Sequence, residues 1–363
     1  MRINIFGSPW GTSGFSCHVK NLVNSLAELG HEVRLDCPKP QGWESQVSDV
    51  ELIAMQREMS REYTTIFIGQ PQFLSLAWAE NPKKTILYFV TEGNKVLKMY
   101  EKYMNDERLE QIWCPSQHCK DAILNTFKVN KEIIVIPHGC NTKLFTPKEK
   151  TENKIFSFLS VKGFVLQKGL WDRSGLPYTI KAFYEEFSSK DSCQLLVKVN
   201  MAYSQQQFTL QDILKLTNTP EKPDAPIIKF SFDNIDYKNM PSIYQNADIL
   251  VNIALAEGFA LNVLEGMACG LPSIVNSFGG HMDFCNEQNS WIIDGELKEI
   301  PNDILYEGIS WQVPDIIKLK EVMRYAYSSK EEIRKKSQEA LRTAQQFTWQ
   351  NTALKIIEEI KKI

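Results

Sequence analysis

Short apolar segments alternate with amphipathic helical segments along the chain, and this alternation restricts the fold more than any other feature of the sequence. Residues 2–6 are apolar, a small-residue loop and a helical pattern follow up to Gly30, and residues 32–35 are apolar again. Strands and helices that alternate in this way form parallel sheets with helices on both faces. We therefore expect an α/β fold whose ligands bind at the carboxyl ends of the strands.

The same patterns predict the other elements. Further strands are expected at residues 65–69, 85–90, 111–114, 133–136, 155–161, 194–199, 227–231, 248–253, 273–276 and 290–293. Helices are expected at residues 16–29, 49–62, 116–127, 177–188, 207–216, 240–246, 260–269, 315–327, 330–347 and 349–362. The pattern restarts after a polar run, and 363 residues exceed what one core usually supports. Two domains are therefore expected, joined near residue 145.

Composition narrows the class of protein. A net charge of −3 and an isoelectric point near 6.1 argue against a nucleic-acid-binding surface. No segment has the length of a transmembrane helix, and Met1 leads directly into a strand, which predicts a cytoplasmic protein without a signal peptide. The eight cysteines contain no C-x-x-C pair and are expected to be reduced core residues. Basic residues in segment 95–108 could contact the inner face of an anionic membrane, although interspersed acidic residues favour a solvated helix.

The stretch from residue 247 to residue 294 carries the strongest candidate site. An apolar strand leads to Glu257, and the helix that follows contains Glu265. The first N–H groups of a helix lack intrahelical acceptors and favour a phosphate, while flanking carboxylates favour hydroxyl groups. Together these groups suit a sugar attached to a diphosphate. Because glutamates are also common near helix N-termini for structural reasons, a structural role stays open for either one.

Three further features could complete such a site. The loop of residues 7–14 has the small residues of a phosphate-binding turn, but its spacing favours an ordinary strand-to-helix turn. The basic residues Lys162, Lys168 and Arg173 precede a helix, and fixed cations there would balance the charge of a leaving diphosphate. His18 lies beside the glycine loop and could contact an acceptor hydroxyl, although a lone histidine is more often structural. The sequence contains no D-x-D or H-E-x-x-H motif and no cysteine cluster, so no metal site is expected.

The segment EGFALNVLEGMACGLPSIVNSFGG, residues 257–280, resembles a known family signature. The signature E-G-F-G-L-P-x-L-E-A-M-A-x-G-x-P belongs to retaining glycosyltransferases of family four, a group with the GT-B fold that includes sucrose synthase and bacterial mannosyltransferases. Supporting matches lie at residues 114–116, 136–139, 144–147, 240–248 and 347–349. The resemblance therefore covers nearly the whole chain.

This resemblance implies two Rossmann-like domains whose parallel sheets face a central cleft. Residues 1–145 would form the acceptor domain, completed by the C-terminal helix 348–363 crossing back to it, and residues 146–347 would form the nucleotide-sugar domain. The resemblance further implies transfer of a sugar, with retention of its anomeric configuration, from a UDP-, GDP- or ADP-sugar. The acceptor would be a glycan, a lipid, a protein or another hydroxyl compound. Such enzymes hold no tightly bound cofactor and generally need no metal in the site.

The resemblance also assigns roles to particular residues. Glu257 would face the donor sugar near its transferring carbon, and Arg173 and Lys168 would balance the leaving diphosphate. Glu265 would hold the ribose hydroxyls and the first amides of its helix the diphosphate, so the donor-binding residues would be Glu265, Gly258, Phe259, Ala260, Leu261, Gly11 and Gly14. Acceptor contacts would come from Trp10, His18 and Glu92.

The chain departs from the signature in three places. Ala260 and Asn262 replace a glycine and a proline. An insertion around residues 164–171 blurs the basic pair, so that both Arg173-Ser174-Gly175 and Lys168-Gly169 match it. Glu92 stands where a donor-side histidine is expected. Two alternatives therefore stay open: a GT-B-like epimerase or phosphorylase, and a non-catalytic nucleotide-sugar or glycan-binding protein.

Overall fold

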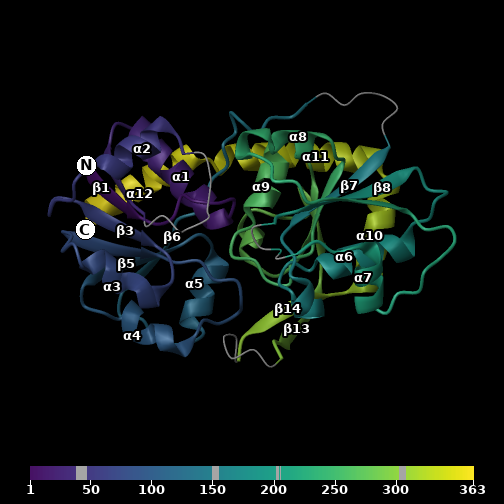
Figure 1. Ribbon diagram of the computed structural model, residues 1–363, viewed down its shortest axis with the longest axis horizontal. Coiled ribbons are helices and arrows are strands. Elements are labelled where there is room, and N and C mark those ends of the chain that lie inside the picture. The colour runs from purple at the N-terminus through teal and green to yellow at the C-terminus, as the bar shows by residue number, and fades with distance from the viewer. Residues whose placement is uncertain (38–46, 149–154, 202–203, 205, 302–307) are drawn as a thin grey trace. The chain divides into compact units, whose positions relative to one another are not determined.

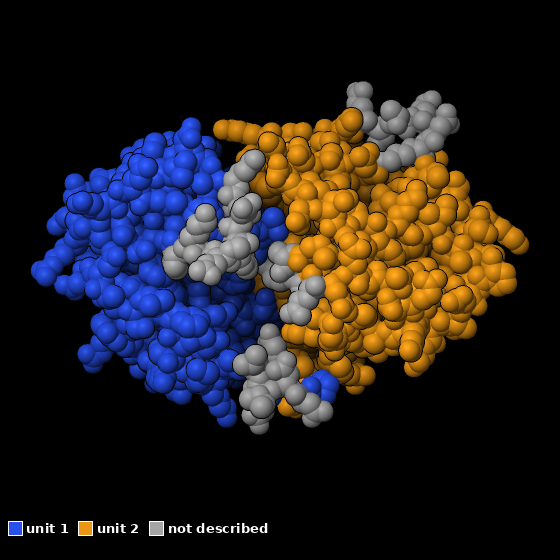
Figure 2. Space-filling model, in the orientation of Figure 1, with its two compact units in different colours: residues 1–139, 301–309, 347–363 blue, residues 140–300, 310–346 orange. Residues whose placement is uncertain are grey.

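Two parallel six-stranded sheets form the framework of the protein (Figure 1). The computed structural model describes residues 1–37, 47–148, 155–201, 204, 206–301 and 308–363. The chain divides into two compact units, coloured separately in Figure 2. Unit 1 comprises residues 1–139, 301–309 and 347–363, and unit 2 comprises residues 140–300 and 310–346. The domain boundaries expected from the sequence, at residues 145 and 348, stay a prediction.

The sheet of unit 1 is parallel throughout, as its sequence pattern predicts. Its strands are β1 (Arg2–Phe6), β2 (Glu32–Asp36), β3 (Thr64–Ile68), β4 (Lys84–Tyr88), β5 (Leu109–Cys114) and β6 (Glu132–Val135). They lie in the order β2-β1-β3-β4-β5-β6. Because β2 lies on one side of β1 and β3 on the other, the order in which strands are added reverses between β1 and β3.

Helices cover both faces of this sheet. They are α1 (Gly14–Glu28), α2 (Asp49–Gln56), α3 (Leu74–Trp78), α4 (Glu101–Met104), α5 (Gln117–Leu124) and α12 (Trp349–Lys362). Apolar residues of α1, α2 and α12 pack with Ile66 of β3, whereas those of α3, α4 and α5 pack with Phe67, which points to the opposite face. The C-terminal helix α12 thus lies beside α1 in unit 1 (Figure 1), which confirms that the end of the chain returns to the first Rossmann-like unit.

Unit 2 contains the second parallel sheet. Its strands are β7 (Phe156–Lys162), β8 (Cys193–Val199), β9 (Ile227–Ser231), β10 (Ile249–Asn252), β11 (Ser273–Asn276) and β12 (Ser290–Ile293). They lie in the order β12-β11-β10-β7-β8-β9, so the strand order reverses between β7 and β10. This is the strand order of a Rossmann dinucleotide-binding fold. Its core is apolar and includes the fully buried Phe158, Phe183 and Leu319.

The remaining elements of unit 2 are mostly helical. Its α-helices are α6 (Leu176–Glu186), α7 (Leu210–Leu216), α8 (Pro241–Gln245), α9 (Leu261–Ala268), α10 (Ile316–Ser328) and α11 (Lys330–Gln346). The antiparallel strands β13 (Gly295–Glu299) and β14 (Ser310–Pro314), which the sequence pattern did not predict, pair with each other. The N–H of Gln312 in β14 donates to the carbonyl of Leu255 at 2.9 Å, which fastens this pair to the loop after β10.

Several sequence expectations need correction. Helix α2 ends at Gln56, well before residue 62, because the chain turns extended at Arg57, whose carbonyl accepts a hydrogen bond from Arg34 at 3.0 Å. Segment 95–108 contains only the 3-10 helix η2 (Lys98–Tyr100) and the single-turn α4, where one solvated helix was expected. Helix α5 begins after Ser116, whose hydroxyl caps it by accepting a hydrogen bond from the Cys119 N–H at 3.2 Å.

All eight cysteines are free thiols; six of them are buried, as expected of core residues, whereas Cys17 and Cys37 are half-buried. Among the described residues, no helix is both long and apolar enough to cross a membrane. The described residues also contain no group of three or more histidine, cysteine or acidic side chains that could hold a metal ion.

Candidate functional site

The reversal of strand order in unit 2 brings together a carboxylate and two cations. Lys162 is the last residue of β7, and Glu257 lies in the loop between β10 and α9. The ammonium of Lys162 lies 3.4 Å from one carboxylate oxygen of Glu257, and the guanidinium of Arg173 lies 3.5 Å from the other. Arg173 also donates to the carbonyl of Ala256 at 3.3 Å. Since two cations face one carboxylate, the cluster carries excess positive charge. It lies at the carboxyl ends of the strands, where parallel α/β folds bind ligands.

Burial and charge set the ionisation of this cluster. Burial alone would raise the pKa of Glu257, but Lys162, Arg173 and His281 outweigh it, and the pKa of Glu257 is lowered. Burial lowers the pKa of Lys162, and the Glu257 carboxylate partly offsets that effect. The attraction between the buried pair therefore favours the charged forms of both groups. A bound diphosphate would find cations already held in place.

Two glycines allow loops to approach this cluster closely. A Cβ atom on Gly175 would lie 1.6 Å from the carbonyl oxygen of Ile253, and the Leu255 N–H donates to the Arg173 carbonyl at 2.9 Å. Gly279 has a φ of +133°, which side chains rarely adopt, and the N–H of Gly280 donates to the Glu257 carbonyl at 2.7 Å. Both loops thus fix the backbone beside Glu257.

Helix α9 begins with an unusual residue. Ala260, at its N-cap, has a left-handed backbone with φ of 70° and ψ of 65°. This conformation costs a non-glycine residue about 1 kcal/mol, which explains why the family signature has glycine there. The N–H of Val263 donates to the Ala260 carbonyl at 3.0 Å. The N–H of Leu261 lies at the first position of the helix, where no helix carbonyl is placed to accept its hydrogen bond. The start of α9 thus presents an amide and the positive end of the helix dipole.

Asn262, which replaces the proline of the signature, binds the sheet. Its side-chain amide donates to the Val161 carbonyl and to the Asn252 side chain, each at 3.0 Å. It therefore joins α9 to β7 and β10.

Glu265 lies on the buried side of α9 with only 7% of its surface exposed. The hydroxyl of Tyr244 donates to its carboxylate at 2.8 Å. Burial raises the pKa of Glu265 to about 7, although hydrogen bonds from Tyr244 and Tyr237 oppose the shift. The carboxyl is therefore poised to change protonation state near neutral pH.

The structure distributes the other predicted site residues unevenly. Among the described residues, Lys162 and Arg173 are the cations paired with Glu257, whereas Lys168 is exposed on the 3-10 helix η3 (Leu166–Trp171). Lys162, which was not in the predicted catalytic set, is thus the lysine that pairs with Glu257. The sequence could have indicated Lys162, because it is the last residue of β7 and ligands of parallel sheets bind at the carboxyl ends of the strands.

The predicted residues of unit 1 lie around the start of α1 and after β4. Gly11 has a left-handed φ of 85°, and its carbonyl accepts a hydrogen bond from Ser16 at 3.0 Å, while Gly14 is the first residue of α1. Trp10 contacts the thiol of Cys37. Burial raises the pKa of this thiol to about 11, and the contact with Trp10 opposes the shift. The carbonyl of Glu92 bonds to the ring of His118 at 2.9 Å.

His18 is fully buried in an aromatic cluster. Its ring lies 4.3 Å from that of His138, 4.4 Å from that of Tyr88 and 5.6 Å from that of Trp349, measured between ring centroids. This position argues against direct contact between His18 and an acceptor. It also ties α1 to β4 and α12.

The burial of His18 predicts that unit 1 loses stability in mild acid. Burial lowers the pKa of His18 to about 3, whereas the ordinary value is 6.5. Between these values the unfolded chain binds a proton that the native state does not, so the stabilisation is complete above pH 6.5 and falls as the pH drops towards 3. Lowering the pH from 7 to 5 is expected to reduce the free energy of unfolding by about 2 kcal/mol through His18.

Amide hydrogen exchange in β1 and α12 measures this loss, because both elements pack in the same core as α1. His18→Phe should remove about 2 kcal/mol of the change in the free energy of unfolding between pH 7 and pH 5. His138 should keep its own contribution to this change, because burial lowers its pKa too. Equal pH dependence in the wild type and the variant would contradict the prediction.

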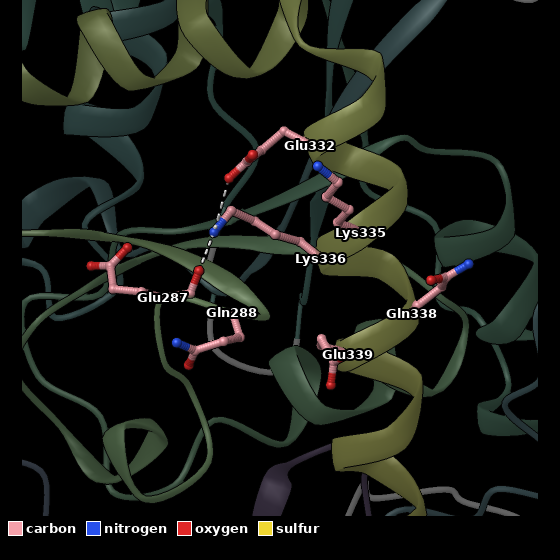
Figure 3. Close-up of a pocket in the computed structure, with 7 residues that line it drawn as sticks. All are labelled: Glu287, Gln288, Glu332, Lys335, Lys336, Gln338 and Glu339. Atoms are coloured by element: carbon pink, nitrogen blue, oxygen red, sulfur yellow. Dashed lines mark hydrogen bonds and ion pairs between the residues drawn. The ribbon is translucent and has the colours of Figure 1, made fainter.

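A surface depression of about 360 Å³ lies elsewhere on unit 2 (Figure 3). It is lined by α11 and by the segment before β12. Lys336 of α11 extends across it to the carbonyls of Glu287 and Ser290, and its ammonium lies 3.5 Å from Glu332. Two lysines line the depression: Lys336 holds α11 to the sheet, and the ammonium of Lys335 lies 3.0 Å from the carboxylate of Glu331.

Comparison with known proteins assigns part of the chain to a family. Residues 229–326 match the family described as Glycosyl transferases group 1, and this segment includes Glu257, Glu265 and Tyr244. No curated protein matches the chain at significant similarity.

Solved structures share the fold over nearly the whole chain. Sucrose-phosphate synthase from Thermosynechococcus elongatus is 16% identical, with a TM-score of 0.72 over 100% of this chain and 98% of that one. A glycosyltransferase from Rickettsia africae is 15% identical, with a TM-score of 0.67 over 99% and 98%. Anabaena HepE, solved with UDP and glucose, is 12% identical, with a TM-score of 0.66 over 100% of both chains. Residues 229–326 thus match glycosyl transferases group 1, and the shared architecture shows that the whole chain has the GT-B fold, with two Rossmann-like domains.

Proposed function

We propose that the protein transfers a sugar from a UDP-sugar to a hydroxyl acceptor with retention of anomeric configuration. The observation that carries the proposal is the cluster of Lys162, Arg173 and Glu257 beside the start of α9, the helix that also holds Glu265. UDP is the proposed nucleotide because structures with this fold contain it, including HepE with UDP-glucose and the pneumococcal O-GlcNAc transferase GtfA with UDP and GlcNAc.

Each part of the cluster has a role in the proposal. Glu265 accepts hydrogen bonds from the ribose hydroxyls, and the amides of Gly258, Phe259, Ala260 and Leu261 face the diphosphate. Lys162 and Arg173 balance the negative charge that develops on the leaving diphosphate, so the proposal needs no metal in the site. Glu257 positions the two cations and faces the donor sugar.

Retention follows if the acceptor attacks from the face that the diphosphate leaves. The bond from the anomeric carbon to the phosphate oxygen breaks, the bond to the acceptor oxygen forms, and the leaving phosphate takes the acceptor proton. Unit 1 is proposed to supply the acceptor contacts from Trp10 and Glu92, and Gly11 and Gly14 stay predicted donor-binding residues. Since His18 is buried, its proposed role is to hold α1 and the loop before it in place.

Replacing Glu265 by Gln tests the donor site. The substitution keeps the shape of the side chain but removes a charged acceptor, so UDP-glucose affinity is expected to fall about 10- to 100-fold. Because the pKa of Glu265 is about 7, the wild-type affinity should rise from pH 6 to pH 8 as the carboxyl ionises, and Glu265→Gln should lose this dependence. Isothermal titration calorimetry at both pH values measures affinity and proton release.

The control is Glu287→Gln, an exposed glutamate of the same unit, which should leave donor affinity unchanged. Unchanged affinity in Glu265→Gln would show that the ribose site is misassigned.

Incubation of the protein with donor alone separates the alternatives, because an epimerase would convert the donor without an acceptor. A protein that binds the donor tightly but turns it over with no glycan, lipid, protein or nucleic-acid acceptor would be a non-catalytic binder.

A further inference from the structure

The sheet of unit 1 has a pocket at the same topological position as the candidate site of unit 2. In unit 2, Lys162 ends β7 and Glu257 lies after β10, and the strand order reverses between these two strands. In unit 1 the reversal lies between β1 and β3, and a pocket of about 210 Å³ lies at the carboxyl ends of these two strands. Ligands of open α/β sheets bind at this position. The pocket therefore lies where this type of sheet favours a binding site.

The walls of the pocket are apolar and uncharged. The rings of Phe6 and Phe67 lie 5.2 Å apart between centroids, and Phe73 and Leu76 form a rim in which each side chain is 52% exposed. No lining residue carries an ionisable side chain. A phosphate or carboxylate would therefore lose its hydration without gaining a cation, which disfavours a charged ligand.

The pocket also offers a hydrogen bond. The hydroxyl of Ser8, which lines it, is buried and has no hydrogen-bond partner among the described residues. Buried hydroxyls are nearly always hydrogen-bonded, so rotation of the Ser8 side chain towards the pocket would be favoured when a ligand oxygen there can accept its hydrogen bond. Gln70 has a fixed orientation, because its carbonyl oxygen accepts a hydrogen bond from Tyr100 at 2.8 Å.

We propose that this pocket binds an aryl group that the sugar acceptor carries next to an ether or glycosidic oxygen. The inference rests on the proposed function and adds the class of acceptor. A cavity of about 150 Å³ lined by Leu, Ile and Phe is sufficient to bind benzene, so this pocket is large enough for one aromatic ring. An aryl ring packs well at an offset against phenylalanine rings and, being rigid, loses little conformational entropy on binding. The oxygen attached to the ring would accept the hydrogen bond from Ser8.

Binding of matched glycosides without donor tests the proposal. The probes are phenyl, octyl and methyl glucoside, titrated against the full chain by calorimetry or ligand-observed NMR. Phenyl glucoside should bind at least about tenfold more tightly than methyl glucoside, because only the former buries a ring. Phe73→Asp and Leu76→Asp should each remove most of this difference. Both side chains are half exposed, so the variants are expected to fold, and melting temperatures verify this.

The matched control is Leu124→Asp on α5, where a leucine of the same unit is 51% exposed outside the pocket. It should bind phenyl glucoside like the wild type. Equal binding of phenyl and methyl glucoside, or an unaltered preference in both rim variants, would overturn the proposal. Tighter binding of octyl glucoside through the same residues would assign the pocket to an alkyl chain instead. A wild-type dimer that Leu76→Asp dissociates would make the rim a self-association surface and also overturn it. These titrations contain no donor. Their outcome therefore does not depend on the donor-site test with Glu265→Gln, and the two proposals can fail separately.

Discussion

Lys162→Met is expected to reduce the turnover number for sugar transfer about 100- to 1000-fold, the usual effect of removing one preorganised group that stabilises developing charge. The ammonium of Lys162 lies 3.4 Å from Glu257 and is buried, so its charge acts where water screens it weakly. Methionine fills similar space without the charge. The donor should still bind through Glu265 and the start of α9, and the loss should therefore appear in kcat more than in KM.

A second buried lysine provides the control. Lys198 lies near the end of the neighbouring strand β8 and has the same exposed fraction as Lys162, 8%. Its ammonium donates to the Val199 carbonyl at 2.7 Å and does not pair with Glu257. Lys198→Met should therefore retain nearly the wild-type turnover number. Equal losses in the two variants would mean that any buried cation at this sheet edge matters through folding, and the role proposed for Lys162 would be wrong.

The framework of the fold could be predicted because strand and helix patterns are strong in this sequence. The strands at residues 227–231, 273–276 and 290–293 have the predicted bounds, since turn residues flank each apolar run. By contrast, β13 was missed because the side chains of GELKE are nearly all exposed, so no buried face produces a period of two. Segment 295–299 forms a strand because it pairs with β14, which begins eleven residues after β13 ends.

The site could be predicted only where its residues are close in sequence. Glu257, Ala260 and Glu265 lie within nine residues of one motif, so their shared position around the start of α9 was readable. Lys162 is 95 residues from Glu257, and their contact depends on β7 lying next to β10 in the sheet. Lys168 entered the predicted set because Lys168-Gly169 competed with Arg173-Ser174-Gly175 as the match to the basic pair. Only the strand order distinguishes the two lysines.

Gly175→Ala is expected to destabilise unit 2 by at least about 3 kcal/mol, because a left-handed backbone strain adds to a steric overlap. The φ of Gly175 is +65°, and its Cβ would lie 1.6 Å from the Ile253 carbonyl oxygen. Neither atom can move alone, because the neighbouring Arg173 carbonyl bonds to the Leu255 N–H at 2.9 Å. Relief of the overlap must therefore move Arg173 away from Glu257, so transfer activity should fall even in molecules that remain folded.

Gly270→Ala separates strain from overlap, since Gly270 in the same unit also has a left-handed φ, +79°, but its Cβ would meet the nearest atom at an ordinary 3.4 Å. This variant should lose only about 1 kcal/mol, the cost of the backbone conformation. Urea unfolding of both variants, followed by amide hydrogen exchange in β7 and β10, compares the losses. If Gly175→Ala lost no more than Gly270→Ala, the loop would be able to move away from β10. The geometry at Glu257 would then have to be held by Gly279 and β14 without help from the Arg173 loop.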